Sequence, residues 1–391
     1  MTSKQEALII LGSPLWSGRL EAMHAVARTL MSRGAEVWVA AGDSQTGVRF
    51  AQAGARVLPG SAGGASIQGI HRLCRRHQFS LVITSGQRAG LIGGIGASLA
   101  RAPLVVHHAR PGEFTASREG LAAYWDAAVR RMTARVSHFI VTATAEDREA
   151  ALRDGVAGPD RIETIYPGID LARYRRVSRT AARERLGFAA HETIIGTLGT
   201  DADRSGCETL LHAMVPVLAR FPAARLVFSG YDRWSEELRQ EAALLGFDDR
   251  VTFLGGKRDT AAVLASYDIL VLPSRRNASA GCLLDAMASG RPIVACNTAA
   301  NAELIHHGTS GMLASPGDSG ALAGAICCLL ANADLAASYA AAALEAVARR
   351  FVLERSVEQH LRLYDRLLGR AASSPSAGRA SCSAVAAGGA Q

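Results

Sequence analysis

A segment in the second half of the chain combines an anion-binding turn with a carboxylate. The apolar run DILVLPS (268–274) is followed by two arginines and by the small residues 278–281, and a helix is expected around 283–288. Amide groups at the start of such a helix are unpaired, and the helix dipole favours an anion there. Within the helix, Asp285 offers a carboxylate that can accept two hydroxyl hydrogen bonds. These residue types allow an anion at the helix start and a hydrogen-bonding carboxylate beside it.

Two features of the first half also follow apolar runs. The loop GSPLWSG (12–18) comes after ALIIL, and His108 ends the run APLVVHH (102–108). The loop is expected at the carboxyl end of its strand, where ligands bind in such sheets, although a plain turn between strand and helix is equally consistent with it. A strand-end histidine can hydrogen-bond a ligand hydroxyl, but more often it is only a partly buried polar residue. His107 takes this place if the strand is shifted by one residue.

Other chemistries find little support in the sequence. His306 and His307 are adjacent and point in different directions on any regular element, and no DxD pair flanks a suitable strand, so no metal site is expected. The serines and histidines form no nucleophile elbow of the GxSxG kind. Hydrolase chemistry is therefore not predicted.

The apolar pattern of the chain places these residues at strand ends. Short apolar runs alternate with helical segments, which is typical of βαβ units and a parallel sheet. The runs of the first half are ALIILG (7–12), AEVWVAAG (35–42), ARVLPG (55–60), SLVITSG (80–86), APLVVHH (102–108) and HFIVTAT (138–144). The pattern restarts with ETIIGTLG (192–199), ARLVFSG (224–230), RVTFLG (250–255), DILVLPS (268–274), RPIVAC (291–296) and GMLAS (311–315). Two doubly wound α/β domains are predicted.

A polar and basic connection marked by Pro167 and Gly168 separates the two patterns. The predicted organisation is a first domain (1–168), a connection (169–190), a second domain (191–350), a closing helix (351–369) and a disordered tail (370–391). The tail is small, polar and free of aromatic residues, a composition that cannot build a core.

Composition limits the class of protein. The chain has 391 residues, of which 49% are apolar and 20% charged, so it can fill two cores. Its net charge of +8 comes from scattered arginines with no basic stripe, which argues against nucleic acid as a partner. We expect no export signal, no membrane-spanning helix and a cytoplasmic location. The seven cysteines, expected as reduced thiols, are Cys74, Cys207, Cys282, Cys296, Cys327, Cys328 and Cys382.

The second half resembles the sugar-nucleotide-binding half of retaining glycosyltransferases of family 4, also called group 1. The resemblance is carried by DILVLPSRRNASAGCLLDAMASGRPIVAC, NAELIHHGTSGMLASPGD and ALAGAICCLL. The segment YPGIDLARY (166–174) looks like the family's interdomain signature, and FVLERSVEQHLRLYDRLL (351–368) looks like its closing helix. This family implies the GT-B fold, with two Rossmann-like domains facing across a cleft. The first domain would take the acceptor and the second the donor.

The resemblance also implies roles for individual residues. Family members carry two glutamates, one for the donor sugar and one for the ribose, and Asn277 and Asp285 occupy these positions. Asn277 has lost the charge and is equally consistent with a loop asparagine. The implied catalytic residues are His108, Asn277 and Asp285. The implied donor-binding residues are Thr197, Arg204, Ser205, Arg275, Ser279, Ala280, Gly281, Cys282, Asp285 and Glu303. The implied acceptor-side loop residues are Gly12, Ser13, Trp16, Ser17 and Gly18.

The donor site departs from the family in its charges. Family members place an arginine and a lysine on the donor diphosphate, and this chain has Thr197 and Ser205 there. Loss of one well-placed stabilising group typically costs about 3 to 4 kcal/mol at the transition state. Arg204 replaces the lysine if the loop shifts by one residue, and Arg275 or Arg276 can approach the same anion. Glu303 matches an acidic residue of the family, or it caps the next helix and nothing more.

The function that the resemblance implies is transfer of a hexose from a nucleotide-diphosphate sugar to an acceptor hydroxyl, with retention and without a metal or other cofactor. The acceptor would be a saccharide or a lipid-linked molecule, in polysaccharide or glycolipid assembly. Basic residues of the first domain are compatible with peripheral association with the inner face of the cell membrane. The alternative is a catalytically impaired homologue that binds a nucleotide sugar or serves as a partner subunit. An epimerase is less favoured, since no paired acids are found.

Overall fold

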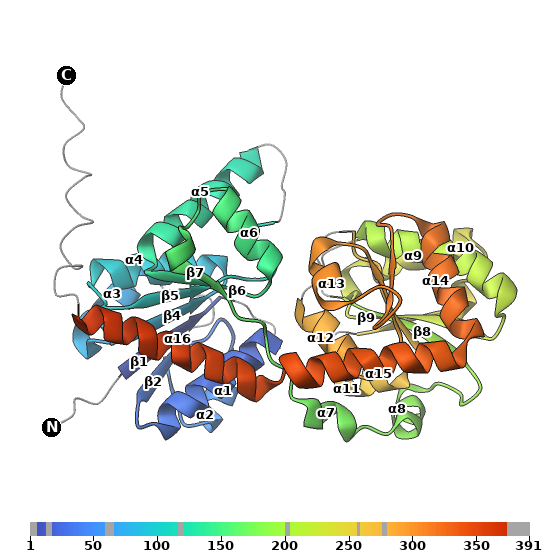
Figure 1. Cartoon of the computed structure of the whole chain (residues 1–391), viewed down its shortest axis with the longest axis horizontal. Coiled ribbons are helices and arrows are strands. Elements are labelled where there is room, and N and C mark those ends of the chain that lie inside the picture. Colours follow the sequence, from blue (N-terminus) through green and yellow to red (C-terminus); the bar gives the residue numbers. More distant parts are fainter. Residues whose placement is uncertain are drawn as a thin grey trace. The chain divides into compact units, whose positions relative to one another are not determined.

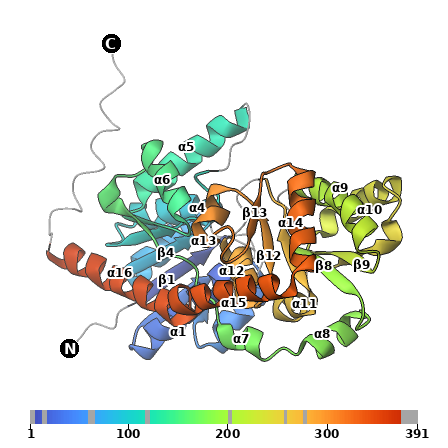
Figure 2. The ribbon, with the colours of Figure 1, turned by 45° about the vertical axis from the view of Figure 1, so that its right-hand side comes forward.

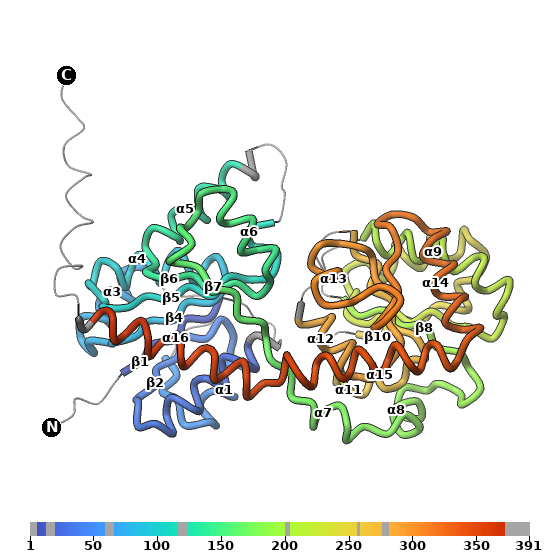
Figure 3. Tube along the Cα trace, in the orientation of Figure 1, coloured from blue at the N-terminus to red at the C-terminus, as the bar shows by residue number. Residues whose placement is uncertain are grey.

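The chain divides into two compact units, Met1–Tyr166 with Glu354–Gln391, and Pro167–Leu353. A computed structural model describes residues 6–12, 18–58, 66–115, 121–199, 204–255, 259–275 and 280–373, traced in colour in Figure 3. Each unit holds one sheet flanked by helices (Figure 1), and every strand pairing in both sheets is parallel. The predicted pair of doubly wound α/β domains is confirmed.

The sheet of the first unit has the strand order β3-β2-β1-β4-β5-β6-β7. Its strands are β1 (Glu6–Leu11), β2 (Glu36–Ala40), β3 (Arg56–Val57), β4 (Leu81–Ser85), β5 (Val105–His108), β6 (Phe139–Thr142) and β7 (Ile162–Thr164). Its helices are α1 (Gly18–Ser32), α2 (Ser44–Gln52), α3 (Ile67–His77), α4 (Gln87–Leu99), α5 (Leu121–Val136), α6 (Ala145–Arg153), η1 (Pro159–Arg161) and α16 (Leu353–Ser373).

The glycine-rich helix α4 packs unusually close to its neighbours. A Cβ atom on Gly90 would lie 2.5 Å from His107 Cε1, and one on Gly96 would lie 2.8 Å from Ile70 Cβ. Because real Cβ atoms do not approach other atoms so closely, larger residues at these positions would push α4 away from β5 and α3. The glycines therefore set the height of α4 above the sheet.

The sheet of the second unit has the strand order β10-β9-β8-β11-β12-β13. Its strands are β8 (Thr193–Leu198), β9 (Ala224–Ser229), β10 (Val251–Leu254), β11 (Ile269–Leu272), β12 (Ile293–Cys296) and β13 (Met312–Ala314). Its helices are α7 (Leu171–Arg175), α8 (Arg179–Leu186), α9 (Arg204–Arg220), η2 (Asp232–Trp234), α10 (Ser235–Leu244), η3 (Asp248–Arg250), α11 (Thr260–Ser266), α12 (Ala280–Ala288), α13 (Ala299–Leu304), α14 (Ser319–Ala331) and α15 (Ala333–Arg350).

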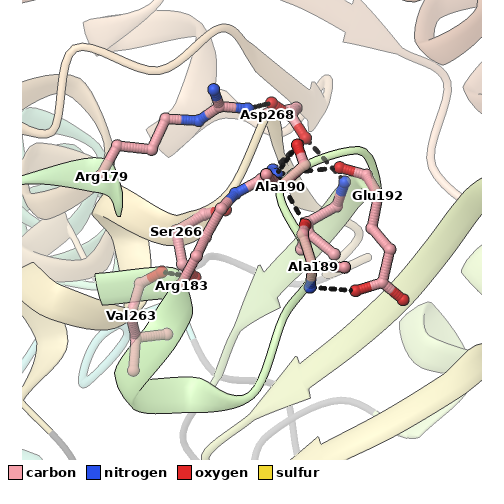
Figure 4. Close-up of polar contacts among 9 residues, drawn as sticks. Arg179, Arg183, Ala189, Ala190, Glu192, Val263, Ser266 and Asp268 are labelled. Atoms are coloured by element: carbon pink, nitrogen blue, oxygen red, sulfur yellow. Dashed lines mark hydrogen bonds and ion pairs between the residues drawn. The ribbon is translucent and has the colours of Figure 1, made fainter. Parts of the chain in front are cut away.

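Helices cover both faces of this sheet (Figure 2). On one face, apolar residues of α9, α10 and α14 form a core with Ile195 and Phe228. At the strand starts, the buried side chain of Arg183 donates to Ser266 O over 3.0 Å and to Asp268 Oδ2 over 2.5 Å (Figure 4). The same Asp268 oxygen accepts the Ile194 amide over 2.7 Å, and Arg179 forms a second ion pair with this carboxylate. This network fixes β8 against β11, the two central strands.

The connection between the patterns holds more structure than the sequence indicates. Helix α7 is capped by Asp170 and helix α8 by Ser178, both within the predicted connection 169–190. Strand β7, just before Pro167 in the predicted first domain, pairs with β6. Strand β3, expected over 55–60, has only two residues. Helix α16 belongs to the first unit from Glu354 onward and is followed to Ser373, so the first residues of the expected tail are helical. The residues from 374 on lie outside the described part.

Across the ranges that the structure describes, no single helix has both the length and the apolarity needed to cross a bilayer. Helices α14 and α15 meet that test only as a pair, bent by 104°.

Candidate functional site

The strand order of the second unit reverses between β8 and β11, which lie side by side. In open parallel sheets, ligands bind at such a switch point, outside the carboxyl ends of the strands. Two connections meet there, because a Cβ atom on Gly206 at the start of α9 would lie 2.4 Å from Pro273 O, just after β11. Of the predicted donor residues that the structure describes, Thr197 lies on β8, Arg275 lies on the connection after β11, and the others lie on the helices α9, α12 and α13.

Asp285 is half-buried within α12, and its carboxylate is held from outside the helix. The Tyr174 hydroxyl on α7 donates to Asp285 Oδ1 over 2.5 Å. A hydrogen bond to a carboxylate at this length is charge-assisted and stronger than one between neutral groups. Tyr174 lies in the segment YPGIDLARY, and no pattern in the sequence predicts that its hydroxyl contacts Asp285, which holds the position of the family's second glutamate. This contact adds Tyr174 to the candidate site.

The family's arginine is replaced by Thr197 in this chain, and the side chain of Tyr231 packs beside it. Thr197 is fully buried at the end of β8, and its Oγ1 lies 3.2 Å from the hydroxyl of Tyr231. The Tyr231 ring crosses the backbone of Gly199, where a Cβ atom would lie 2.0 Å from the ring carbon Cζ. Burial raises the pKa of Tyr231 well above its usual value, with Cys207 as a smaller cause, so its hydroxyl is neutral. The position aligned with the family's arginine thus holds a buried, neutral Thr197–Tyr231 pair.

The arginines near this edge differ in how they are held. Arg204, expected to replace the family lysine, donates from Nε to Glu208 Oε1 over 2.7 Å on its own helix, and its guanidinium lies 5.9 Å from the Trp234 ring. Arg275 is exposed three residues after the end of β11 and lies against Gly317, where a Cβ atom would be 3.2 Å from the arginine Nε. Arg275 therefore lies at the carboxyl edge of the sheet, and Arg204 contacts Glu208.

The other residues predicted to bind the donor lie on three helices of the second unit or outside the described residues. Ser205 opens α9 beside Arg204, and Ala280, Gly281 and Cys282 form the first turn of α12. Glu303 is half-buried within α13, whose N-cap is Thr298, and the next helix, α14, is capped by Asp318. The capping role considered for Glu303 is thus wrong. Asn277, Ser279 and Arg276 lie outside the described residues.

The first unit has its own switch point, between β1 and β4. The Gly12 amide donates to Ser85 O over 3.0 Å, and a Cβ atom on Gly12 would lie 3.2 Å from Ala89 N at the start of α4. Gly18 is the first residue of α1. The other predicted acceptor-loop residues, Ser13, Trp16 and Ser17, lie outside the described part of the chain.

Both candidate histidines are buried, on opposite faces of β5. His108 shares a hydrogen bond of 2.8 Å between Nε2 and the Tyr364 hydroxyl, and its ring stacks on His360 at 5.0 Å. Burial lowers the pKa of His360 to about 4, so this ring is neutral at pH 7. The contact partners come from α16, about 250 residues away in the chain. No pattern local to His108 predicts this pairing.

His107 is enclosed by a polar chain within the first unit. Its Nδ1 lies 3.0 Å from Thr84 Oγ1, and its Nε2 lies 2.9 Å from Glu113 Oε1. Burial alone would raise the pKa of Glu113, but the charge and hydrogen bond of His107 hold it below its usual value. The second Glu113 oxygen accepts the Arg110 amide over 2.9 Å. His107 thus orders the loop after β5.

Among the described residues, no three histidine, cysteine, aspartate or glutamate side chains come together as a metal-binding group. The cysteines that the structure describes are free thiols.

Comparison with known proteins extends these observations. A model of glycosyl transferases group 1 matches residues 192–332, and a model of glycosyltransferase family 4 matches residues 21–173. A D-inositol 3-phosphate glycosyltransferase of Rhodococcus opacus (strain B4) is 31% identical over 44% of this chain and 41% of its own length. A phosphatidyl-myo-inositol mannosyltransferase of Mycobacterium leprae (strain TN) is 33% identical over 53% of this chain and 54% of its own length. The chain spans about half the length of the curated relatives it matches.

Solved structures share the fold of nearly the whole chain. The Anabaena protein HepE, crystallised with UDP and glucose, aligns with a TM-score of 0.79 at 21% identity, over 93% of this chain and all of its own. The sucrose-phosphate synthase of Thermosynechococcus elongatus aligns with a TM-score of 0.75 at 21% identity, over 94% of this chain and all of its own. The family models match both halves in order, and the fold is that of solved GT-B enzymes. The chain belongs to glycosyltransferase family 4 and has the GT-B fold.

Proposed function

We propose that the protein transfers a hexose from a nucleotide-diphosphate sugar to an acceptor hydroxyl with retention of configuration. Family membership supports glycosyl transfer as the reaction class. The observation that carries the proposal is Asp285, a carboxylate at the family's ribose-binding position whose Oδ1 is fixed by Tyr174 over 2.5 Å. A carboxylate fixed in this way is suited to accept hydrogen bonds from paired hydroxyls of a ribose.

The donor diphosphate would be received at the start of α12. Amides in the first turn of this nine-residue helix, with its dipole, favour an anion, and Arg275 brings a cation to the same edge. The UDP and glucose crystallised with the Anabaena relative support a nucleotide-sugar donor. Asn277 would contact the sugar.

The proposed mechanism needs no metal. The acceptor hydroxyl attacks the anomeric carbon on the face from which the diphosphate departs, and a phosphate oxygen takes the proton. Most of the acceleration would come from holding both substrates in reacting geometry. In this proposal the side chains bind and orient, and none forms a covalent bond to the sugar.

We propose a saccharide or lipid-linked acceptor and peripheral association with an anionic membrane face from the cytoplasm. The names of the relatives include inositol phosphate and phosphatidylinositol, which are phosphate-bearing polyols. The exposed stripe of α5 supports a membrane surface as partner, since aromatic and basic side chains on one helix face suit the bilayer interface. Its described members are Tyr124, Trp125, Ala128, Arg131, Met132 and Arg135.

The neutral Thr197–Tyr231 pair favours a second candidate function. A departing diphosphate gains negative charge, and the buried pair offers no cation to stabilise it. A homologue that binds a nucleotide sugar but transfers it slowly, or acts as a partner subunit, would have such a site.

The test is a transfer assay with UDP- and GDP-sugars against inositol phosphate, phosphatidylinositol and simple saccharides. We expect release of nucleoside diphosphate that persists in EDTA, and a product whose anomeric configuration, measured by proton NMR coupling, matches that of the donor. An inverted product would contradict retention, and loss of activity in EDTA would contradict metal independence. Tight nucleotide binding with no turnover would favour the second candidate.

A further inference from the structure

The contact between Tyr174 and Asp285 joins two segments that are 111 residues apart in the chain. The carboxylate of Asp285 accepts and the phenol hydroxyl donates, over 2.5 Å. Family members carry a glutamate where this chain has Asp285, so the carboxylate here is shorter by one methylene. The shorter side chain has fewer rotatable bonds, and the phenol restricts its rotation further.

Tyr174 is itself held rigidly. Its side chain is 9% exposed, and the short helix α7 that carries it is capped by Asp170, whose Oδ1 accepts the Ala172 amide over 2.9 Å. The neighbouring Arg173 pairs with Asp259 at the start of α11 over 2.9 Å. A tyrosine anchored on both sides of its helix can impose its position on Asp285, rather than follow it.

The anchoring extends to the residues before α7. The Ile169 amide donates to Phe351 O over 2.8 Å, and the Leu353 amide donates to Ile169 O over 3.1 Å. This short parallel bridge joins α7 to the end of α15 within the second unit. The position of the phenol is therefore set by contacts that do not involve α12, namely the Asp170 cap, the Arg173–Asp259 ion pair and the two backbone hydrogen bonds of Ile169.

We propose that Tyr174 is a positioning residue for the ribose of the donor: its hydrogen bond orients the Asp285 carboxylate toward the ribose hydroxyls. The proposal rests on the function proposed above, in which Asp285 contacts the ribose. A carboxylate has about four acceptor directions, and the phenol hydroxyl takes one of them at Oδ1. Tyr174 thereby makes the site selective for ribonucleotides over deoxynucleotides.

The experiment measures binding of UDP, dUDP, GDP and dGDP to the full chain by isothermal titration calorimetry. Tyr174→Phe removes only the hydroxyl, and Tyr267→Phe is the matched control, because it removes a fully buried hydroxyl elsewhere in the second unit. In Tyr174→Phe we expect about tenfold weaker binding of the preferred ribonucleotide. The affinity for the deoxy analogue should fall by a smaller factor, so the ratio of the two affinities decreases. Tyr267→Phe keeps the wild-type preference.

A double variant separates positioning from a general loss of structure. Since Tyr174 acts through Asp285, Tyr174→Phe combined with Asp285→Asn should bind no more weakly than Asp285→Asn alone. Additive losses, or an unchanged ribose preference in Tyr174→Phe while the wild type binds nucleotide, would overturn this proposal and leave the proposed function intact. Absence of nucleotide binding by the wild type would overturn both. If Tyr174→Phe does not fold, Asp285→Asn must still lose the ribose preference, and a retained preference overturns the proposal.

Discussion

Restoring the family arginine at the end of β8 is expected to damage the protein rather than repair it. Thr197 is fully buried, and the space beyond its hydroxyl is taken by the Tyr231 ring, which is held against Gly199. Thr197→Arg must displace that ring and place a guanidinium among neutral groups. The expected result is a less stable second unit without tighter nucleotide binding.

The magnitude follows from two terms. Loss of the 3.2 Å Thr197–Tyr231 hydrogen bond costs about 1 kcal/mol, which Thr197→Val measures by itself. Overpacking a filled site adds about 1–3 kcal/mol, and an unpaired buried charge adds more. Thr197→Arg should therefore lower the free energy of unfolding by at least about 3 kcal/mol, a large share of the stability of an ordinary domain.

Urea unfolding followed by circular dichroism provides the assay. Thr193→Arg is the matched control, because Thr193 lies on the same strand but is only half-buried, and we expect a change of less than about 1 kcal/mol there. Adding Tyr231→Ala to Thr197→Arg should make the combined loss smaller than the sum of the two single losses. A Thr197→Arg protein as stable as the wild type, with tighter UDP binding, would refute the reasoning.

Three further predictions concern the first unit. Gly90→Ala places a Cβ atom 2.5 Å from His107 and should lower the free energy of unfolding by about 2 kcal/mol. Gly324→Ala in α14, where a Cβ atom would have nothing within 4 Å, should raise the free energy of unfolding by about 0.5–1 kcal/mol. Equal shifts of the two variants in thermal unfolding would contradict this prediction. His360 has a folded-state pKa of about 4, below the 6.5 of the unfolded chain, so stability is full above pH 6.5 and falls as pH drops toward 4. Between pH 7.5 and 5 the free energy of unfolding should fall by about 2 kcal/mol. His360→Phe should make this fall smaller, and an equal fall in the variant and the wild type, from unfolding measured at both pH values, would argue against this prediction. The double variant Tyr124→Ala/Trp125→Ala should co-sediment less with vesicles of phosphatidylglycerol and phosphatidylcholine than the wild type does. Leu244→Ala, which changes a similarly exposed residue of the second unit, should co-sediment as the wild type does. Equal co-sedimentation of the double variant and the Leu244→Ala variant would exclude the α5 stripe as the membrane-binding surface.

The elements of both sheets were largely predictable because their strands are buried on both faces. Such strands are short continuous apolar runs, and DILVLPS and RPIVAC enclose β11 and β12. Strand β7 was not predicted, because its sequence, IET, carries polar residues and its position depends on pairing with β6. Helix α7 was not predicted, because five residues are too few to show helical periodicity.

The candidate site was predictable as a set of strand ends, but its contacts were not. Asp285 followed from its place in the family motif, whereas its partner Tyr174 comes from a segment 111 residues earlier. The absence of an arginine at Thr197 was visible in the sequence, but not that Tyr231 fills the space. In the same way, the surroundings of His108 depend on Tyr364 and His360, which only the folding of α16 onto β5 brings close.

The measurement that tests the central claim most directly is hydrogen–deuterium exchange of the full chain with and without UDP or GDP. The claim is that a nucleoside diphosphate binds at the carboxyl edge of the second sheet, where β8 and β11 adjoin. The account predicts slower exchange in peptides that cover α7 and the first turns of α12, and no change in α10, which lies beside the edge strand β10. Protection confined to other segments, or none at saturating nucleotide, would contradict it.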